Sequence, residues 1–277
     1  MRPLQTRAGT RKRMNRASKP MSDASTPVLR CANLCKTYGD SPVLDDVSFE
    51  LPAGRFSGLV GVNGAGKTTL LKCILDFCDF RSGRIELFGA PHSAPGARRQ
   101  LAYLPERFVP PFFLTGREFL EIMFGLSNQP WSQPAVDQAL AGIGLASEAL
   151  VRPVRSYSKG MMQKLGLAAC FLSERRLVVL DEPMSGLDPL ARVRVKELLA
   201  GLRRRGDTTL LLTSHSLADI DEICDHMLVL HDGRIAYAGT PDGFRAKYGA
   251  VTLEEAFLGS LAGTKAEQTP PAAINNA

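Results

Sequence analysis

The sequence lacks any hydrophobic run close to the roughly 18–20 residues that a helix needs to span a bilayer. Its longest apolar stretches, such as residues 177–180 and 210–212, have only the length of buried strands. If the protein works at a membrane, the membrane-spanning part is therefore expected to be another chain.

The sequence also lacks a CxxC pair among its six cysteines and a secretory signal. Several cysteines stand inside apolar patterns, as Cys170 does between Ala169 and Phe171. This predicts buried, reduced thiols and a cytoplasmic protein.

Net charge is missing from most of the chain. The formal charge of +6 falls entirely in residues 1–26, where seven basic residues face the single acid Asp23, and the remainder is balanced. We expect residues 1–26 to be a basic disordered tail, and we expect no specific nucleic-acid partner. The alternatives for this tail are contact with an anionic membrane surface or with nucleic acid, and translation could begin at Met14 or Met21.

From Val28 onward, short strands alternate with helical patterns. Strands are expected within residues 28–60 and at 85–88, 177–180, 209–213 and 227–230. Helices are expected at 67–77, 159–174, 189–204, 217–224 and 253–261, with an interrupted helical stretch over 114–152 and a polar tail from 264. This alternation predicts an α/β fold with a largely parallel sheet that helices cover on both faces.

A glycine-rich segment follows the apolar residues 56–60. It matches the pattern GxxxxGK followed by Ser or Thr, and reads Gly61, Val62, Asn63, Gly64, Ala65, Gly66, Lys67, Thr68, with Thr69 next. Glycines allow successive backbone N–H groups to face one anion, and the following helix adds positive potential at its N-terminus. Lys67 is expected to contact the β- and γ-phosphates of ATP, and the Thr68 hydroxyl to reach Mg²⁺.

A second apolar run, residues 177–180, ends in two acids, Asp181 and Glu182. A buried parallel strand would deliver both to the sheet edge beside the phosphate loop. Asp181 is then expected to hold Mg²⁺ through water, and Glu182 to orient or polarise the attacking water. The alternative for this pair alone is a solvated acidic turn.

Together these segments resemble the ABC ATPases over roughly residues 28–245. Residues 157–161 occupy the place of the family's signature, residues 185–188 resemble its D-loop, and His215 resembles its switch histidine. Tyr38 stands where the family has an aromatic that stacks on adenine. The resemblance implies an α/β P-loop NTPase of the ABC type, with a mostly parallel sheet, an antiparallel N-terminal β portion and an inserted helical subdomain.

The resemblance also implies boundaries and a mechanism. The ATPase domain is expected over 27–249, with its core at 27–105 and 160–249, a helical subdomain at 106–159, and a C-terminal helix and polar tail at 250–277. Two such domains would pair head to tail, each chain presenting Ser158, Lys159, Gly160 and Asp188 to the ATP of the other. The partners implied are a second copy or a homologous ATPase, and a separately encoded membrane permease.

Three positions depart from the family pattern. Lys159 replaces a glycine and Met161 a glutamine in the signature, and Glu106 replaces the Q-loop glutamine, where a carboxylate can approach Mg²⁺. These departures resemble the ABC-2 exporter branch, which implies the ATPase subunit of an exporter on the cytoplasmic face of the inner membrane. The alternatives are an importer ATPase, a soluble ABC ATPase of translation or DNA repair, and a catalytically silent regulatory module.

Residues 108–114 combine two prolines with three phenylalanines. The resemblance places this segment where the family touches its membrane subunit, so we expect it to belong to a docking surface. The alternative is that the phenylalanines fill the core of the helical subdomain.

Overall fold

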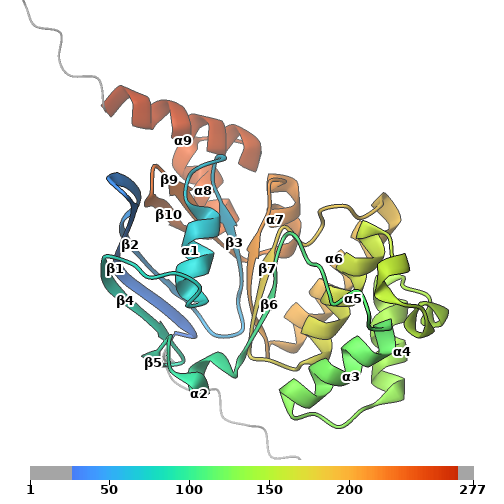
Figure 1. The fold of residues 1–277 in the computed structure, drawn as a ribbon. Coiled ribbons are helices and arrows are strands. Elements are labelled where there is room, and N and C mark those ends of the chain that lie inside the picture. Colours follow the sequence, from blue (N-terminus) through green and yellow to red (C-terminus); the bar gives the residue numbers. More distant parts are fainter. Residues whose placement is uncertain (1–26, 268–277) are drawn as a thin grey trace, which may run out of the picture.

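Two β-sheets and a group of helices make up residues 27–267, the part of the chain that the computed structural model describes (Figure 1). The predicted α/β class, with a mostly parallel sheet and an antiparallel N-terminal portion, is confirmed. None of the helices in this part of the chain is both long and apolar enough to cross a membrane.

The larger sheet has six strands in the order β10-β9-β3-β8-β7-β6, and all neighbours are parallel except β10 with β9. Its strands are β3 (Phe56–Val60), β6 (Leu101–Leu104), β7 (Leu177–Asp181), β8 (Thr209–Thr213), β9 (His226–His231) and β10 (Arg234–Gly239). Every residue of β3, β7 and β8 is buried, as expected for central strands that are covered on both faces. Their carboxyl ends meet at one edge, where ligands bind in such sheets.

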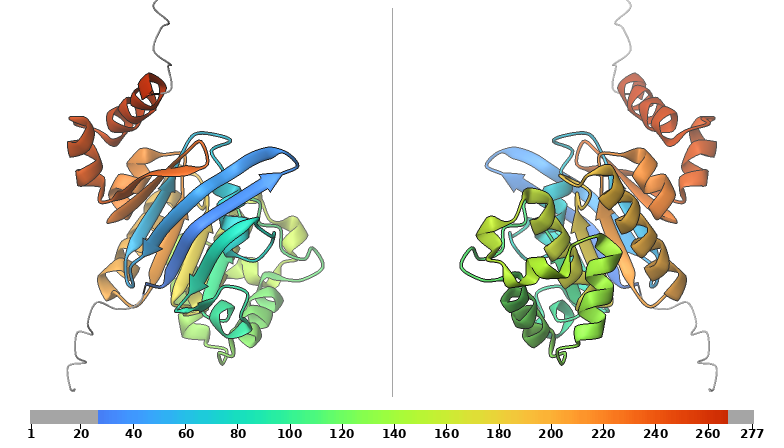
Figure 2. Two further views of the ribbon diagram at one scale, coloured as in Figure 1. Left: turned by 90° about the vertical axis from the view of Figure 1, so that its left-hand side faces the viewer. Right: turned by 90° about the vertical axis from the view of Figure 1, so that its right-hand side faces the viewer.

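The smaller sheet is antiparallel, in the order β2-β1-β4-β5. Its strands are β1 (Leu29–Tyr38), β2 (Ser41–Leu51), β4 (Ser82–Leu87) and β5 (Ala90–Pro91). A hydrophobic core joins this sheet to α1 (Lys67–Ile74) and the larger sheet, through residues such as Leu29, Leu70, Ile74 and Leu228. Figure 2 shows the antiparallel sheet on one side of the molecule and a lobe of helices on the other.

The helices of the lobe are α3 (Gly116–Ser127) and α4 (Gln133–Ile143), which precede two 3-10 turns, Ser147–Val151 and Val154–Ser156. They pack with α5 (Lys159–Leu172) on a second core that extends to the sheet (Figure 1). The remaining helices are α2 (Pro95–Arg98), α6 (Pro189–Arg205), α7 (Leu217–Ile223), α8 (Pro241–Tyr248) and α9 (Leu253–Glu267).

Some expected boundaries are wrong. Helix α1 ends at Ile74 rather than near residue 77, because Asp76 takes a left-handed φ of 60°. Helix α9 continues to Glu267, so residues 264–267 are helical and not part of a polar tail. The expected basic tail at 1–26 and residues 268–277 lie outside the described residues.

Candidate functional site

The glycine-rich loop lies between β3 and α1, as predicted. Gly61 passes so close to β9 that an added Cβ would lie 2.3 Å from the Leu230 carbonyl oxygen. Gly66 takes a left-handed φ of 105° at the start of α1. The Lys67 ammonium donates to the carbonyl oxygens of Gly61 (2.6 Å) and Val62 (3.2 Å), and its burial lowers the pKa of the amine. The loop thus holds its lysine beside the backbone that is expected to wrap a phosphate.

Asp181 and Glu182 follow β7 at the same sheet edge. The parallel register sets Asp181 opposite Thr213 of β8, whose hydroxyl donates to Asp181 Oδ1 at 2.6 Å. The same hydroxyl oxygen accepts a hydrogen bond from the Glu182 backbone N–H at 2.9 Å. Burial raises the pKa of Asp181, and the Thr213 hydrogen bond opposes that rise.

Glu182 and His215 face each other beyond the ends of β7 and β8. His215 Nε2 lies 3.3 Å from Glu182 Oε1, and the His215 backbone N–H donates to Oε2 at 3.3 Å. Among the described residues no donor makes a hydrogen bond to the buried Oε1, so its hydrogen-bonding capacity is unfilled. Burial raises the pKa of Glu182, so its carboxylate is a stronger base than an exposed glutamate.

These groups line one cavity of about 270 Å³. Its walls are Val43, Asn63, Gly64, Ala65, Gly66, Lys67, Thr68, Thr69, Glu106, Asp181, Glu182 and His215. The structure therefore brings together the predicted phosphate loop, both acids, the histidine and Glu106. Val43 of β2 was not predicted, because only the antiparallel sheet brings it beside the loop.

The cavity has hydrogen-bond donors that suit the phosphates of ATP and oxygen ligands that suit Mg²⁺. Backbone N–H groups, the Lys67 ammonium and the start of α1 suit phosphate oxygens, while the Thr68 hydroxyl and the Asp181 carboxylate are hard oxygen ligands of the kind that Mg²⁺ prefers. Within residues 27–267, however, no group of three or more histidine, cysteine or acidic side chains is arranged to hold a metal by itself. A magnesium ion bound here would share its coordination with phosphate oxygens and water.

The predicted signature and D-loop residues do not line this cavity. The exposed Ser158 is the N-cap of α5, and its hydroxyl oxygen accepts from the Met161 N–H at 3.2 Å. Asp188 is the N-cap of α6 and accepts from the Ala191 N–H at 2.8 Å, which lowers the pKa of the aspartate. The Ser158 hydroxyl and the Asp188 carboxylate each cap a helix, so both residues stabilise the local structure of this chain in addition to any contact with a nucleotide.

Tyr38 also lies outside the cavity lining. It ends β1 with half of its surface exposed, and the Lys36 ammonium lies 4.7 Å from its ring centroid. An exposed aromatic ring of this kind is suitable for stacking on a base. Its adenine contact stays a prediction.

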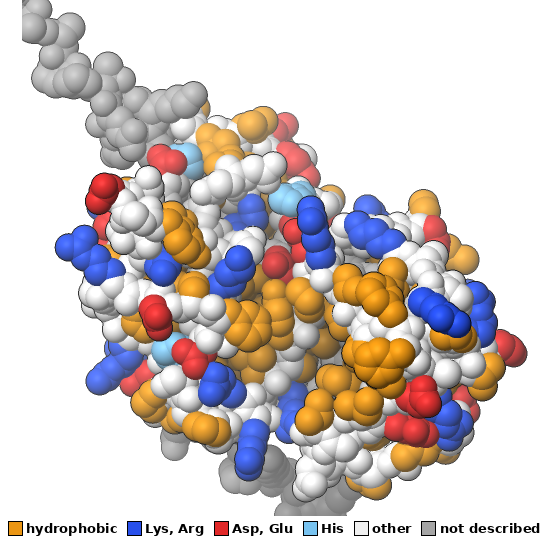
Figure 3. Space-filling model, in the orientation of Figure 1, with side chains coloured by type: hydrophobic (Ala, Val, Ile, Leu, Met, Phe, Trp, Pro, Cys, Tyr) orange, Lys and Arg blue, Asp and Glu red, His pale blue; other side chains and the backbone are white. Residues whose placement is uncertain are grey.

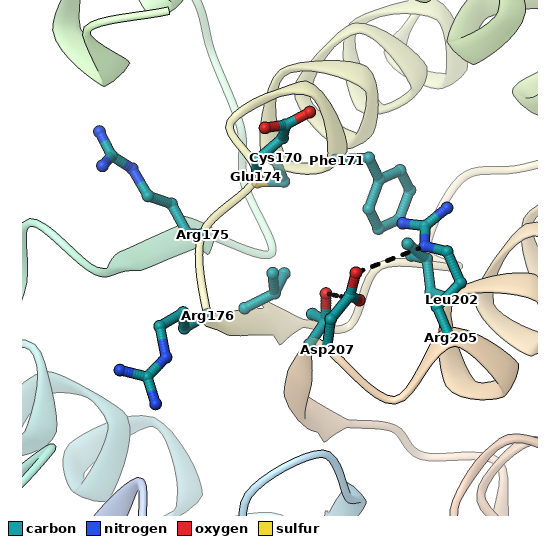
Figure 4. Close-up of a pocket in the computed structure, with 10 residues that line it drawn as sticks. Cys170, Phe171, Glu174, Arg175, Arg176, Leu202, Arg205 and Asp207 are labelled. Carbon is teal, nitrogen blue, oxygen red and sulfur yellow. Dashed lines mark hydrogen bonds and ion pairs between the residues drawn. The ribbon is translucent and has the colours of Figure 1, made fainter. Parts of the chain in front are cut away.

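A larger cavity, of about 470 Å³, lies at the other end of the sheet, where β7 and β8 begin (Figure 4). Two of its arginines are engaged outside it, and the third pairs with an acid of the cavity wall. Arg175 donates to the Leu126 carbonyl, Arg176 to Gln100 Oε1, and Arg205 pairs with Asp207 at 3.8 Å. The cavity therefore offers no convergent charge, and the chemistry of the molecule belongs to the smaller cavity at the carboxyl ends of the strands.

Fold and cavity together define a P-loop nucleotide-binding protein. The ABC transporter family profile matches residues 44–185. The chain therefore belongs to the ABC transporter family, as the resemblance implied, and its ATPase domain binds ATP.

Relatives agree with this assignment. An uncharacterized ABC transporter ATP-binding protein of Nostoc is 38% identical over 202 residues, 72% of this chain and 60% of that protein. The Nod factor export ATP-binding protein I of Sinorhizobium fredii is 35% identical over 232 residues, 82% of this chain and 66% of that protein. A solved ATP-binding subunit of an ABC transporter has a TM-score of 0.77 and 32% identity, covering 84% of this chain and 99% of the other.

Replacement of Thr213 by valine should impair both acids at once. The change keeps the side-chain shape but removes the donor to Asp181 and the acceptor for the Glu182 N–H, at a cost of about 2 kcal/mol in unfolding free energy. We expect kcat for ATP hydrolysis to fall as well. Thr209→Val is the matched control, because buried Thr209 accepts from Gly54 at the other end of β8. Thr209→Val should lower stability and leave kcat per folded molecule unchanged. If kcat were equal in the two variants, the role of Thr213 would be contradicted.

Proposed function

We propose that the chain is the ATP-hydrolysing subunit of a membrane exporter, working at the cytoplasmic face of the inner membrane with a separately encoded permease. The observation that carries the proposal is the single cavity that combines the phosphate loop with Asp181, Glu182 and His215. The Sinorhizobium relative is named for Nod factor export, which supports export as the direction of transport.

In this proposal the cavity hydrolyses ATP with its own side chains. The loop and Lys67 bind the β- and γ-phosphates, and the Glu182 carboxylate accepts a hydrogen bond from the water that attacks the γ-phosphorus. His215 contacts the Glu182 carboxylate and orients it. Because His215 also lines the cavity, its imidazole is proposed to contact the γ-phosphate. The raised pKa of Glu182 favours the transfer of a proton from that water to the carboxylate.

We further propose that two copies, or this chain and a homologous ATPase, complete each other's sites. The Ser158 hydroxyl and the Gly160 backbone lie outside the chain's own cavity, at the exposed start of α5. A helix N-terminus attracts phosphate, so this segment is suited to the γ-phosphate of ATP that the other copy holds. ATP would then hold two copies together, and its hydrolysis would release them.

Magnesium ion is expected to be required for hydrolysis. When bound, it would neutralise phosphate charge, and Thr68, Asp181 and Glu106 are the residues proposed to hold it directly or through water. ATPase activity measured with excess chelator should be lost, while Glu106→Gln, which removes one negative charge, should raise the Mg²⁺ concentration for half-maximal activity. Comparable activity without divalent ion would contradict this assignment.

An exposed apolar surface is proposed as the docking site for the permease. We call it the 108–126 surface; its exposed large hydrophobic residues are Val109, Phe112, Phe113, Ile122 and Leu126. Phe112 is 56% and Phe113 84% exposed, so these two do not fill the subdomain core, whereas Phe108 packs on Phe119 with ring centroids 5.7 Å apart. Figure 3 shows hydrophobic side chains gathered where the sheet meets the helical lobe, which is where this segment runs. Contiguous exposed apolar groups mark interaction surfaces.

Co-purification from membranes tests the function as a whole. Tagged wild-type chain and Glu182→Gln would be isolated in ATP, which should hold the variant in its ATP-bound, paired state. Recovery of a polytopic membrane protein with the variant would support the exporter subunit and identify the permease. Recovery of ribosomes or nucleic acid without a membrane protein would contradict the transport proposal and leave the ATPase in place.

A further inference from the structure

The direction of the Glu182 side chain depends on an unusual stretch of backbone. Glu182 itself takes a left-handed φ of 49°, and the chain then turns tightly, with the Ser185 N–H donating to the Glu182 carbonyl at 3.0 Å. Gly186 follows with a φ of 77°. Any shift of this turn, which we call the 183–186 turn, therefore moves the carboxylate at its start.

One face of α5 holds the 183–186 turn. Gln163 is almost fully buried, 2% exposed, and its amide donates to the Pro183 carbonyl at 3.3 Å. One helical turn earlier, the Lys159 ammonium donates to the Ser185 hydroxyl at 3.4 Å. Positions four apart lie on the same side of a helix, so both side chains reach the same turn from the same face.

The backbones approach closely at the same place. A Cβ added at Gly160 would lie 3.0 Å from the Gly186 carbonyl oxygen, and one added at Gly186 would meet the Lys159 side chain at 3.0–3.3 Å. The aliphatic part of Lys159 therefore lies over Gly186 while its ammonium reaches Ser185. A contact this close transmits movement, because packed groups cannot interpenetrate.

We infer that Gln163 and Lys159 are positioning residues that connect the signature segment to Glu182 of the same chain. The inference rests on the proposed function, in which Ser158 and Gly160 bind the ATP of a second copy. The start of α5 then carries two sets of contacts, one toward the other copy's nucleotide and one toward its own 183–186 turn. When the signature segment binds the other copy's nucleotide, it adjusts the position of the Glu182 carboxylate in its own chain. ATP hydrolysis at the two sites is thereby coordinated.

Lys159 thereby acquires a role different from the one its place in the signature implies. Its ammonium is directed at Ser185 in its own chain, where a glycine would leave the turn without this donor. Gln163 lies outside the signature pattern and was not predicted, since nothing in the sequence shows that its amide meets Pro183.

The test compares steady-state kinetics of four single variants and one double variant with wild type. Gln163→Leu removes the amide at similar size and leaves the buried Pro183 carbonyl without this donor, so the melting temperature should fall modestly. It should also lower kcat per folded molecule by about tenfold with KM for ATP close to wild type, because misplacing a catalytic group affects the reaction more than binding. Lys159→Met and Ser185→Ala should each lower kcat, and the double variant should be no worse than either alone. Lys159→Arg, which keeps a donor, should restore activity.

Controls separate the possible failures. Lys247→Met removes an exposed lysine of α8 that does not line the cavity, and should behave as wild type. The inference is overturned if Gln163→Leu lowers only the melting temperature. It is also overturned if Lys159→Met raises KM for ATP while Ser185→Ala is normal, because Lys159 would then act on the other copy's phosphates. If the wild-type chain has no ATPase activity, or if its activity survives in Glu182→Gln, the proposed function is wrong and this inference is wrong with it.

Discussion

Glu182→Gln should reduce kcat for ATP hydrolysis by about a thousandfold, the range expected when a general base is removed. Glutamine keeps the length of the side chain and can still contact His215, but its amide cannot take a proton from the attacking water. ATP binding should be retained, because the phosphate loop and Lys67 are untouched. Phosphate release measures the first effect, and equilibrium binding of ATP measures the second.

A matched control is Glu222→Gln. Glu222 is an exposed glutamate of α7 that pairs with Lys196 at 2.6 Å and does not line the cavity. Loss of an exposed ion pair costs at most about 1 kcal/mol, so its kcat should remain that of wild type. Normal hydrolysis by Glu182→Gln would show that another group activates the water.

Alanine at both Phe112 and Phe113 should abolish recovery of the permease while leaving the fold intact. Each aromatic that becomes buried at an interface is worth about 2 kcal/mol, so the double change should weaken the complex by several hundredfold. Both rings are already exposed in the chain alone, so the melting temperature should change little. Co-purification from membranes measures the loss, and ATPase activity of the isolated chain checks that the cavity is unaffected.

Leu258→Ala provides the comparison for the 108–126 surface. Leu258 is a similarly exposed apolar residue, 65% exposed, but it lies on α9, distant along the chain from that surface. It should leave co-purification unchanged. If the phenylalanine pair instead lowers stability and spares permease binding, the rings serve the fold and the docking proposal is wrong.

The sequence predicted the parts of the cavity that local pattern determines. The phosphate loop needs glycines between a buried strand and a helix, and Asp181 and Glu182 end an apolar strand, so both signals are contained in short segments. The arrangement of Val43, Thr213 and Gln163 depends on register and on packing between distant segments, which no short pattern records. Strand β10 and helix α8 were missed for another reason. The apolar residues 235–238 of β10 are consecutive, so the sequence does not show the alternating exposure of the strand, and α8 is too short for a clear helical period.

The left-handed backbone at Glu182 also bears on how such a protein can change over evolutionary time. Asparagine and aspartate tolerate this conformation better than most residues, and both are short polar side chains. A descendant carrying Glu182→Asn would therefore keep the turn, the fold and the nucleotide cavity while losing the base that activates water. A single substitution at this position can thus abolish ATP hydrolysis with little cost to the fold. It would convert the enzyme into a protein that binds the nucleotide without hydrolysing it.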